Sequence, residues 1–305
     1  MALEQAPDFT LRQLSYLLAA ARNGTIAGAA AELHVSPSAV SDAITQLERM
    51  FQTQLCVRKQ SQGLTLTTAG KRLASQARPL LAAAQDIEAQ AKAPEGQLAG
   101  PLTIGCYRTL APKILPVLLD EFGAEHPFLT LEIREDSQDR LFAQMDSGEV
   151  DVVFVYETLV PGQPRRAKLM ERPAYVVLSP DHPLAVRGAL QLEELAEYDM
   201  ILLDSPPSRE HTLSMFAERG IEPKVRHRTS SFEVVRTLVA RGLGYGILVQ
   251  KPENSASYED LPLTTREITP RVTPVAVEVV WPATHRTSAK VQAVVDFTKA
   301  RTWNL

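Results

Sequence analysis

Short polar side chains recur at three- and four-residue spacing between residues 36 and 47 of this 305-residue chain. If the stretch is a helix, Val40, Ile44 and Leu47 form an apolar stripe on one face. The opposite face then carries side chains that donate and accept hydrogen bonds, namely Ser38, Ser41, Asp42, Thr45 and Gln46. Such groups can read base edges in the major groove of DNA, where a bidentate contact discriminates by about 1–3 kcal/mol. The chemistry predicted for this face is therefore recognition of DNA bases.

Two short helices joined by a tight turn are needed to position that face. Ser36 can cap the second helix, and Pro37 has the fixed φ of a first helical residue. The first helix, residues 27–33, is rich in alanine, and only His34 and Val35 separate it from the cap. Helices joined so closely cross steeply and need small side chains where they touch. The pattern predicts a helix-turn-helix, although a small-residue helical hairpin in any globular protein has the same pattern.

A predicted β-hairpin follows and adds candidate contacts to the DNA backbone. Residues 55–59 and 64–67 are β-prone and flank a polar turn that ends in glycine. A hairpin beside a helix-turn-helix is a wing, and its basic residues are placed to touch phosphates, which position a protein without selecting a sequence. The predicted phosphate contacts are Arg22, Thr25, Ser36, Arg58 and Lys59. The two basic wing residues could instead be ordinary solvated charges.

Residues 68–93 are predicted to form one long helix, which Pro79 is expected to kink. Apolar residues repeat along it at alternating spacings of four and three, the pattern of a coiled coil: Leu73, Ala77, Leu80, Ala84, Ile87 and Ala91. A polar stretch with Pro94 and Gly96 follows at once, so the helix stands between domains. We expect homodimerisation through this stripe, with packing on its own domain as the alternative.

From residue 102 onward, predicted strands alternate with predicted helices. Strands are expected at 102–105, 129–133, 150–156, 175–178, 200–203, 225–229, 245–249 and 275–281. Helices are expected at 111–123, 137–145, 209–219, 232–240 and 288–302. This alternation is typical of open α/β sheets. We predict two similar α/β lobes, with the end of the chain returning to the first.

Composition and charge limit the class of protein. Hydrophobic residues make up 45% and charged residues 22%, as in ordinary soluble globular proteins. No apolar run could span a bilayer and no signal peptide is recognisable, so we expect a cytoplasmic protein without membrane contact. Two distant cysteines, Cys56 and Cys106, indicate no disulfide or metal site, and a lone cysteine is more often a buried small residue than a redox centre. The net charge of −4 divides into +2 for residues 1–93 and −6 for the remainder, which suits a DNA-binding head on an acidic body.

Three motifs, in this order, resemble those of the LysR-type transcriptional regulators. Residues 20–48 with 64–70 are similar to the N-terminal motif of that family, residues 102–122 to the opening of its effector domain, and residues 235–249 to its late helix-glycine-strand passage. The resemblance covers essentially the whole chain. It implies a winged helix-turn-helix, a dimerising linker helix, an effector domain of the periplasmic-binding-protein type and tetramers made of two dimers. We also expect a contact with RNA polymerase.

The chain departs from the family pattern at three places. Pro37-Ser38 stands where the family usually has Gln-Pro, and Asp42 stands where a basic residue often follows Ser41. Cys56 replaces the usual phenylalanine of the wing strand. An acid facing DNA repels phosphate but can accept from a cytosine amino group. These departures leave the operator sequence open.

A small-molecule effector is expected between the two lobes, where strand ends and helix N-termini converge. The candidate contacts follow a strand or begin a helix: Cys106, Tyr107, Arg108, Thr109, Asp204, Ser205, Ser208, Arg209, Ser230, Ser231 and Phe232. Thr109 stands where the family commonly places a threonine or serine toward its effector. Arg108 and the helix N-termini favour an anionic effector. Each of these residues could instead be a cap, a turn residue or a solvated charge.

Three functions compete for this architecture. The favoured one is a ligand-responsive transcriptional regulator that binds double-stranded DNA, in which effector binding changes operator affinity through a coupling of about 1–3 kcal/mol. The alternative is a solute-binding protein with the same lobes, which the N-terminal head argues against. The third is an enzyme with an appended DNA-binding domain. Because the sequence has no Ser/His/Asp order, paired carboxylates or metal cluster, we expect no catalysis, no cofactor and no metal.

The predicted domain boundaries follow from these segments. The winged helix-turn-helix is expected at 1–67, the linker helix at 68–93, a hinge at 94–100 and the effector-binding domain at 101–305. Within the effector-binding domain, the first lobe is expected at about 101–160 and 272–305, and the second at about 161–271.

Overall fold

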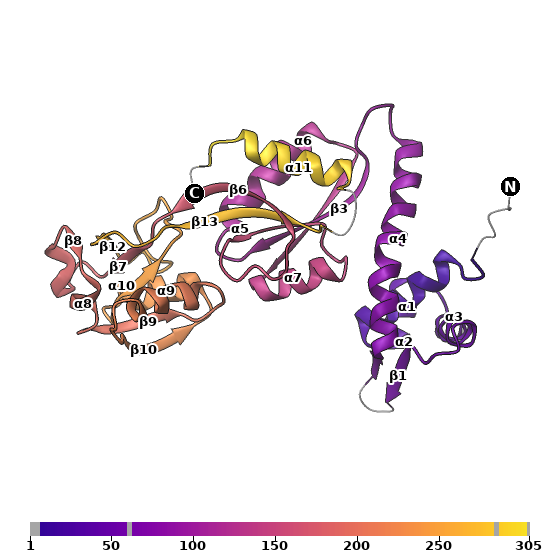
Figure 1. Cartoon of the computed structure of the whole chain (residues 1–305), viewed down its shortest axis with the longest axis horizontal. Coiled ribbons are helices and arrows are strands. Elements are labelled where there is room, and N and C mark those ends of the chain that lie inside the picture. The colour runs from indigo at the N-terminus through magenta and orange to yellow at the C-terminus, as the bar shows by residue number, and fades with distance from the viewer. Residues whose placement is uncertain (1–6, 60–62, 284–286, 304–305) are drawn as a thin grey trace. The chain divides into compact units, whose positions relative to one another are not determined.

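The structure, a computed structural model, describes residues 7–59, 63–283 and 287–303. The side chains of Arg58 and Lys59 lie outside the described part. The chain divides into two units (Figure 1). The N-terminal unit comprises Met1–Pro101 with Asp146–Glu149, and the C-terminal unit comprises Leu102–Met145 with Val150–Leu305.

Three capped helices form the core of the N-terminal unit: α1 (Leu11–Asn23), α2 (Ile26–Glu32) and α3 (Pro37–Met50). Their apolar faces meet in a core that includes Leu14, Leu17, Ala29, Ala30, Ile44 and Leu47. The turn from α2 to α3 needs only a few residues because His34 takes a φ of 55°, in the left-handed region. The predicted helix-turn-helix is confirmed.

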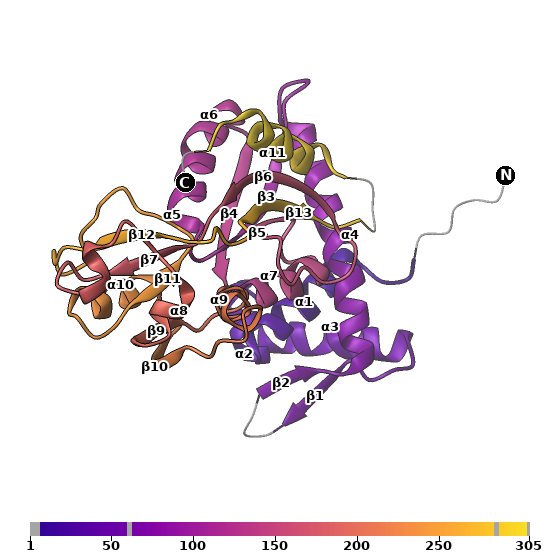
Figure 2. The ribbon, with the colours of Figure 1, turned by 60° about the vertical axis from the view of Figure 1, so that its left-hand side comes forward.

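A two-stranded hairpin follows the three helices, and Figure 2 shows it projecting beyond them. Strands β1 (Cys56–Lys59) and β2 (Gly63–Leu66) are antiparallel, with Cys56 opposite Leu66. Gly63 has a φ of +80°, and a Cβ atom there would lie 2.4 Å from the carbonyl oxygen of Gly24. Only glycine therefore lets the hairpin approach the turn after α1 so closely.

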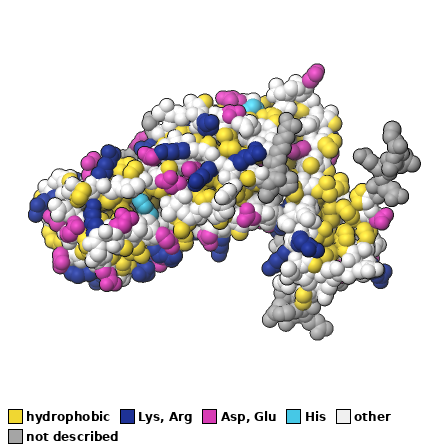
Figure 3. Space-filling model, viewed as in Figure 1, with side chains coloured by type: hydrophobic (Ala, Val, Ile, Leu, Met, Phe, Trp, Pro, Cys, Tyr) yellow, Lys and Arg dark blue, Asp and Glu magenta, His cyan; other side chains and the backbone are white. Residues whose placement is uncertain are grey.

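Helix α4 (Thr68–Lys92) is the predicted long helix, and Thr67 caps it by accepting a hydrogen bond from the Gly70 N–H. Ala77, early in the predicted coiled-coil stripe, is buried in the core of its own unit. Further along, Leu80 is 43% and Ile87 71% exposed. Hydrophobic side chains gather on the surface of the N-terminal unit in the view of Figure 3. The predicted stripe is thus split into a part that packs locally and a part that is exposed within this chain.

The first lobe of the C-terminal unit is a five-stranded sheet in the order β4-β3-β5-β13-β6. Its strands are β3 (Gly100–Tyr107), β4 (Leu129–Asp136), β5 (Val152–Tyr156), β6 (Arg165–Arg172) and β13 (Val275–Trp281). Its helices are α5 (Ala111–Val117), the π-helical turn η1 (Leu118–Phe122), α6 (Gly123–Glu125), α7 (Gln138–Asp146) and α11 (Ala289–Ala300). Helices α7 and α11 cover opposite faces of the sheet (Figure 1). Strands β3 and β5 are parallel, and β13 runs antiparallel to β5.

The second lobe contains a four-stranded sheet, β11-β7-β12-β8, and a parallel pair, β9 and β10. Its strands are β7 (Tyr175–Leu178), β8 (Ala189–Leu190), β9 (Asp199–Leu203), β10 (Lys224–Thr229), β11 (Gly246–Leu248) and β12 (Thr264–Ile268). Its helices are η2 (Pro183–Val186), α8 (Leu192–Leu195), α9 (Ser208–Ala217) and α10 (Phe232–Ala240). The predicted two-lobed α/β fold is confirmed.

Strand β6 corrects the predicted boundary between the lobes. It pairs antiparallel with β13 along its whole length, so residues 165–172 belong to the first sheet and not to the second lobe. Arg165, Arg166 and Lys168 interrupt its apolar residues, because β6 is an edge strand with much of its surface exposed. The missing apolar run is the reason that the sequence did not predict this strand.

Candidate functional site

The polar face of α3 is the first candidate site. Ser38, Asp42 and Gln46 are exposed, and Ser41 and Thr45 are partly buried. The opposite face is fully buried in the core through Val40, Ile44 and Leu47. All five side chains predicted to read bases therefore lie on a helix whose other side is anchored.

Hydrogen bonds to backbone N–H groups fix the starts of α2 and α3. The Ser36 Oγ accepts from the Ala39 N–H at 3.2 Å and lies 2.9 Å from the Ser38 Oγ. The Thr25 Oγ1 accepts from the Gly28 N–H at 2.9 Å. Both predicted phosphate contacts are thus helix caps, and Pro37 follows its cap as the first residue of α3.

The remaining predicted phosphate contacts have different surroundings. Arg22 is 66% exposed but forms an ion pair with Glu32, which neutralises much of its charge. Arg58 and Lys59 belong to β1, but their side chains lie outside the described residues. Sequence reasoning missed Arg49, which is exposed in the last turn of α3, seven residues after Asp42 on the same face. It also missed Gln13 of α1, whose Nε2 donates to the Oε1 of Gln46 at 2.8 Å.

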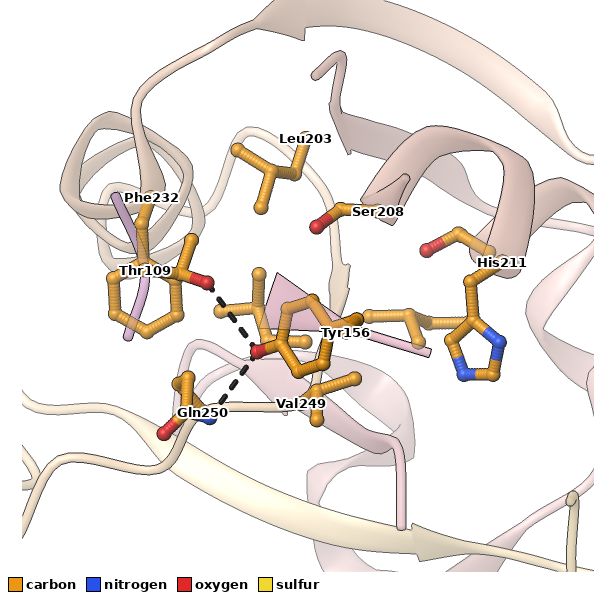
Figure 4. Close-up of a pocket in the computed structure, with 11 residues that line it drawn as sticks. Thr109, Tyr156, Leu203, Ser208, His211, Phe232, Val249 and Gln250 are labelled. Atoms are coloured by element: carbon orange, nitrogen blue, oxygen red, sulfur yellow. Dashed lines mark hydrogen bonds between the residues drawn. The ribbon is translucent and has the colours of Figure 1, made fainter. Parts of the chain in front are cut away.

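A small cavity of about 20 Å³ between the two lobes is the second candidate site (Figure 4). Its lining comes from the ends of strands in both lobes and from helices of the second: Thr109, Tyr156, Leu203, Ser208, His211, Thr212, Phe232, Ile247, Leu248, Val249 and Gln250. A volume of this size is enough for about one water molecule. Pockets for small-molecule ligands are usually several hundred Å³, so this one is nearly closed.

The Tyr156 hydroxyl is the centre of the polar contacts in this cavity (Figure 4). It lies 3.3 Å from the Thr109 Oγ1 and accepts from the Gln250 Nε2 at 3.1 Å. The backbone carbonyl of Gln250 accepts from the Tyr175 hydroxyl at 2.7 Å. Beside the cavity, the Tyr107 hydroxyl of the first lobe lies 3.1 Å from the Ser208 Oγ of the second. Hydrogen bonds therefore connect the two lobes at the cavity.

The cavity has no charged side chain in its lining. Burial raises the pKa of Tyr156 well above its ordinary value, so the phenol stays protonated. Burial lowers the pKa of His211, with a smaller opposing effect of Glu218 and Glu157, so the imidazole stays neutral at pH 7. The Nε2 of His211 is buried without a hydrogen-bond partner among the described residues. The site thus offers hydroxyl, amide and imidazole groups beside an apolar wall.

Of the residues predicted to bind a ligand, Thr109, Ser208 and Phe232 line the cavity. Three others are buried: Cys106, Tyr107 and Ser205. The Cys106 Sγ lies in the core, 3.7 Å from the backbone carbonyl oxygen of Tyr107. Because Cys106 is fully buried, the structure contradicts its predicted place at the cleft.

The predicted charged contacts are also directed elsewhere. Arg108 pairs with Asp136 at 2.8 Å, and Asp204 pairs with Arg209 at 3.0 Å. None of these lines the cavity, and each is paired with a side chain of opposite charge. Ser230 and Ser231 are exposed, and Ser231 caps α10 by accepting from the Val234 N–H. The expectation of charged effector contacts is therefore not met at this cavity.

Tyr156, His211, Thr212 and Gln250 are the polar lining residues that the sequence analysis missed. Two of them had a usable signal, because Tyr156 ends the buried strand β5 and Gln250 follows β11 closely. The carboxyl ends of strands in open α/β sheets are where ligands bind. His211 and Thr212 had none, since both lie within α9 with no pattern around them.

Within the described part of the chain, no helix has the length and hydropathy needed to cross a bilayer. In the same residues, no three His, Cys, Asp or Glu side chains are grouped as metal ligands.

Comparison with known proteins identifies both units. The signature of the LysR substrate binding domain matches residues 95–303, and that of the bacterial regulatory helix-turn-helix protein, lysR family, matches residues 11–71. The chain belongs to the LysR family. Members of this family are DNA-binding transcriptional regulators with an effector-binding domain, and this protein is one of them.

Individual LysR-type relatives cover most of the chain. The transcriptional regulator CfxR of Cupriavidus necator is 30% identical and matches 95% of this chain and 90% of its own. The hydrogen peroxide-inducible genes activator of Escherichia coli O6:H1 is 29% identical over 78% of each chain. Among solved structures, the C-terminal domain of a LysR family regulator from Rhodococcus sp. RHA1 is 42% identical, with a TM-score of 0.64 over 66% of this chain and 98% of that one.

Proposed function

We propose that this LysR-type regulator reads operator bases with α3 and senses a small, uncharged effector in the cavity between the lobes. Ser38, Ser41, Asp42, Thr45 and Gln46 are the proposed base-reading residues. Arg22, Thr25, Ser36, Pro37, Arg49, Arg58 and Lys59 are proposed to contact or approach the phosphates. These assignments rest on the exposed face of a buried recognition helix.

The observation that carries the effector proposal is the absence of charge in a cavity closed by hydrogen bonds between neutral groups. An anion would lose its hydration there without gaining a cationic partner, which is costly. A neutral ligand with one or two polar atoms can replace the hydrogen bonds among Thr109, Tyr156 and Gln250. The effector proposed here is therefore neutral, in contrast to the anionic effector expected from Arg108.

The size of the cavity supports a coupling between binding and lobe arrangement. A ligand of several heavy atoms cannot enter about 20 Å³ unless lining side chains move or the lobes separate. A ligand that enters by separating the lobes binds the separated arrangement better than the closed one, which is the condition for shifting an equilibrium between them. We propose that this shift changes operator binding.

A thermal-shift screen of the full-length protein tests the effector proposal. We expect stabilisation by small neutral compounds that carry hydroxyl or amide groups. Tyr156→Phe should abolish the stabilisation for the same compounds, while Tyr258→Phe, on an 87% exposed residue, should leave it unchanged. Stabilisation by carboxylates or phosphates alone, unaffected by Tyr156→Phe, is the result that would overturn the proposal.

Assembly and partners complete the proposal. We propose a homodimer through the exposed stripe of α4, two dimers in a tetramer, and a contact with RNA polymerase at the promoter. As a regulator of transcription the protein would act in the cytoplasm on double-stranded DNA. The proposed domains are 1–67, 68–93, 94–100 and 101–305, with the first lobe extended to include β6.

A further inference from the structure

A chain of three hydrogen bonds connects the start of α1 to the exposed face of α3. The backbone N–H of Thr10 donates to the Gln13 Oε1 at 2.8 Å, and the Thr10 Oγ1 donates to the same oxygen at 3.2 Å. The Gln13 Nε2 then donates to the Gln46 Oε1 at 2.8 Å. These bonds join residues 33 positions apart through side-chain amides.

The backbone donor at Thr10 determines how both amides are oriented. A backbone N–H can only donate, so the end of Gln13 that faces it must be the carbonyl oxygen. The other end of Gln13 is then the NH₂ group, which can only donate, so it must face the carbonyl oxygen of Gln46. The NH₂ group of Gln46 is left on the opposite side. The usual ambiguity between the two ends of a glutamine amide is removed by this sequence of bonds.

The remaining NH₂ group of Gln46 is available to DNA. Gln46 is exposed, and within the described residues its amide makes no second hydrogen bond. It shares the polar face of α3 with Ser38 and Asp42, at successive four-residue spacings. An unconstrained glutamine presents either a donor or an acceptor and so pairs with adenine N6 and N7 together. A glutamine with its oxygen bonded to Gln13 presents a donor.

We infer that Gln13 is a specificity-determining positioning residue, which makes Gln46 a donor that selects guanine over cytosine at one position of each half-site. Guanine presents two acceptors, N7 and O6, to the major groove, whereas cytosine presents only its N4 amino donor there. The inference rests on the proposed reading of bases by α3. A phosphate oxygen is also an acceptor, and contact with it is an outcome that the test separates.

The variant Gln13→Glu separates the hydrogen bond between Gln13 and Gln46 from the role of Gln13 in capping α1. A carboxylate at this position still accepts from the Thr10 N–H, and an acid in the first turn of α1 is favourable to the helix. It cannot donate to Gln46, so the Gln46 amide should turn and donate to it. The oxygen of Gln46 then faces the groove. The expected preference at the same position is reversed, toward the cytosine N4 amino group.

The wild-type protein first selects a binding duplex from a random-sequence pool. Each position of that duplex is then varied to all four bases, and the full-length proteins are compared by competitive binding at fixed salt. We expect a wild-type preference for guanine over cytosine of about three- to tenfold, the value of one net hydrogen bond. In Gln13→Glu the ratio should reverse, even though the added charge lowers affinity for every duplex. Gln46→Ala should remove the preference with either residue at position 13.

Other outcomes would overturn either the inference about Gln13 alone or the proposed base-reading role of Gln46 as well. If Gln46→Ala alters the profile and Gln13→Glu keeps the wild-type guanine preference, Gln13 acts only as a cap and the inference is wrong, while base reading by α3 stands. If Gln46→Ala lowers affinity equally for all duplexes, Gln46 contacts phosphate, and both the inference and its proposed base-reading role fail. Circular dichroism melts of the wild type, the two single variants and the double variant establish that each is folded.

Discussion

Side-chain caps determine where α1, α2 and α3 begin, and Ser36 is the cap of α3. Its Oγ accepts from the Ala39 N–H, and Pro37 follows it with a preset φ. Without the cap, that N–H keeps only its 3.1 Å hydrogen bond to the backbone carbonyl of residue 36, at the end of the helix that carries Ser38 and Asp42. The orientation of the proposed base-reading face is therefore sensitive to a single hydroxyl.

Ser36→Ala should destabilise the first turn of α3 by about 1 kcal/mol, because alanine has no side-chain acceptor for the Ala39 N–H. The measurement is hydrogen–deuterium exchange of α3 peptides, in which the first turn should open roughly fivefold more often. Ser36→Asp is the matched control, since aspartate caps as well as serine. Equal loss of protection in both variants would show that the hydroxyl does not act as a cap.

His211 gives the C-terminal unit a defined dependence on pH. Burial lowers the pKa of His211 below its ordinary value of 6.5. The unfolded chain therefore binds more protons than the folded one as pH falls below about 6.5, and the free energy of unfolding falls with it. Well above that pH the imidazole is neutral in both the folded and the unfolded chain, so His211 causes no further change in the free energy of unfolding.

His211→Gln should reduce the loss of stability between pH 7 and pH 5, since the variant has no imidazole to protonate. Urea unfolding followed by the fluorescence of Trp281 and Trp303, both in the C-terminal unit, reports it. His182, whose pKa burial also lowers, retains its own share, so His182→Gln should remove a further part. An unchanged pH profile in His211→Gln would contradict the assignment.

At the scale of elements, α4 divides its apolar stripe between two uses. Ala77 is buried against the three-helix core, and Leu80 and Ile87 are exposed along the later turns. A helix with this exposed stripe is expected to bury it against a second copy. Dimerisation should therefore depend on the later turns and not on the first ones.

Ile87→Glu should weaken the homodimer by about tenfold or more in dissociation constant, because burial of one isoleucine side chain is worth about 1.5–3 kcal/mol. Gln85→Glu adds the same charge off the stripe and should leave the dimer intact. Sedimentation velocity over a dilution series measures both. If the two variants dissociate alike, charge and not the stripe is responsible.

At the scale of the whole molecule, the two cysteines limit which signals this regulator can sense. A relative at 29% identity is named as a hydrogen peroxide-inducible activator. Here Cys56 and Cys106 are both buried, and burial raises the pKa of the Cys106 thiol well above its ordinary value. Peroxide reacts with exposed thiolates. Likeness to the relative therefore does not transfer its signal to this chain.

Peroxide treatment of the purified full-length protein should leave its operator affinity unchanged. The measurement is fluorescence anisotropy on a selected duplex before and after treatment, with mass spectrometry of the cysteines. Cys106→Ser should behave as the wild type with and without peroxide. A change in affinity that Cys106→Ser abolishes would mean that the thiol becomes accessible and acts as the sensor.

Local patterns in the sequence determined most of the fold. The caps Thr25 and Ser36, the stripe of α3, the wing and the strand–helix alternation all follow from spacings of a few residues, which set periodicity and helix starts independently of the rest of the chain. They were enough for the helix-turn-helix and the two-lobed α/β architecture. Strands β6, β8 and β12 were the exceptions. In β6 the reason is that its exposed face carries charges where a buried strand has apolar residues.

Tertiary structure alone decided which polar groups share a site. Tyr156 and Gln250 are 94 positions apart, and Gln13 and Gln46 are 33 apart, so no local spacing relates them. Their hydrogen bonds form because strand order and helix packing bring together the segments that contain these residues. For the same reason Arg108 was expected at the cleft, while the fold supplied Asp136 as its partner and left an uncharged cavity.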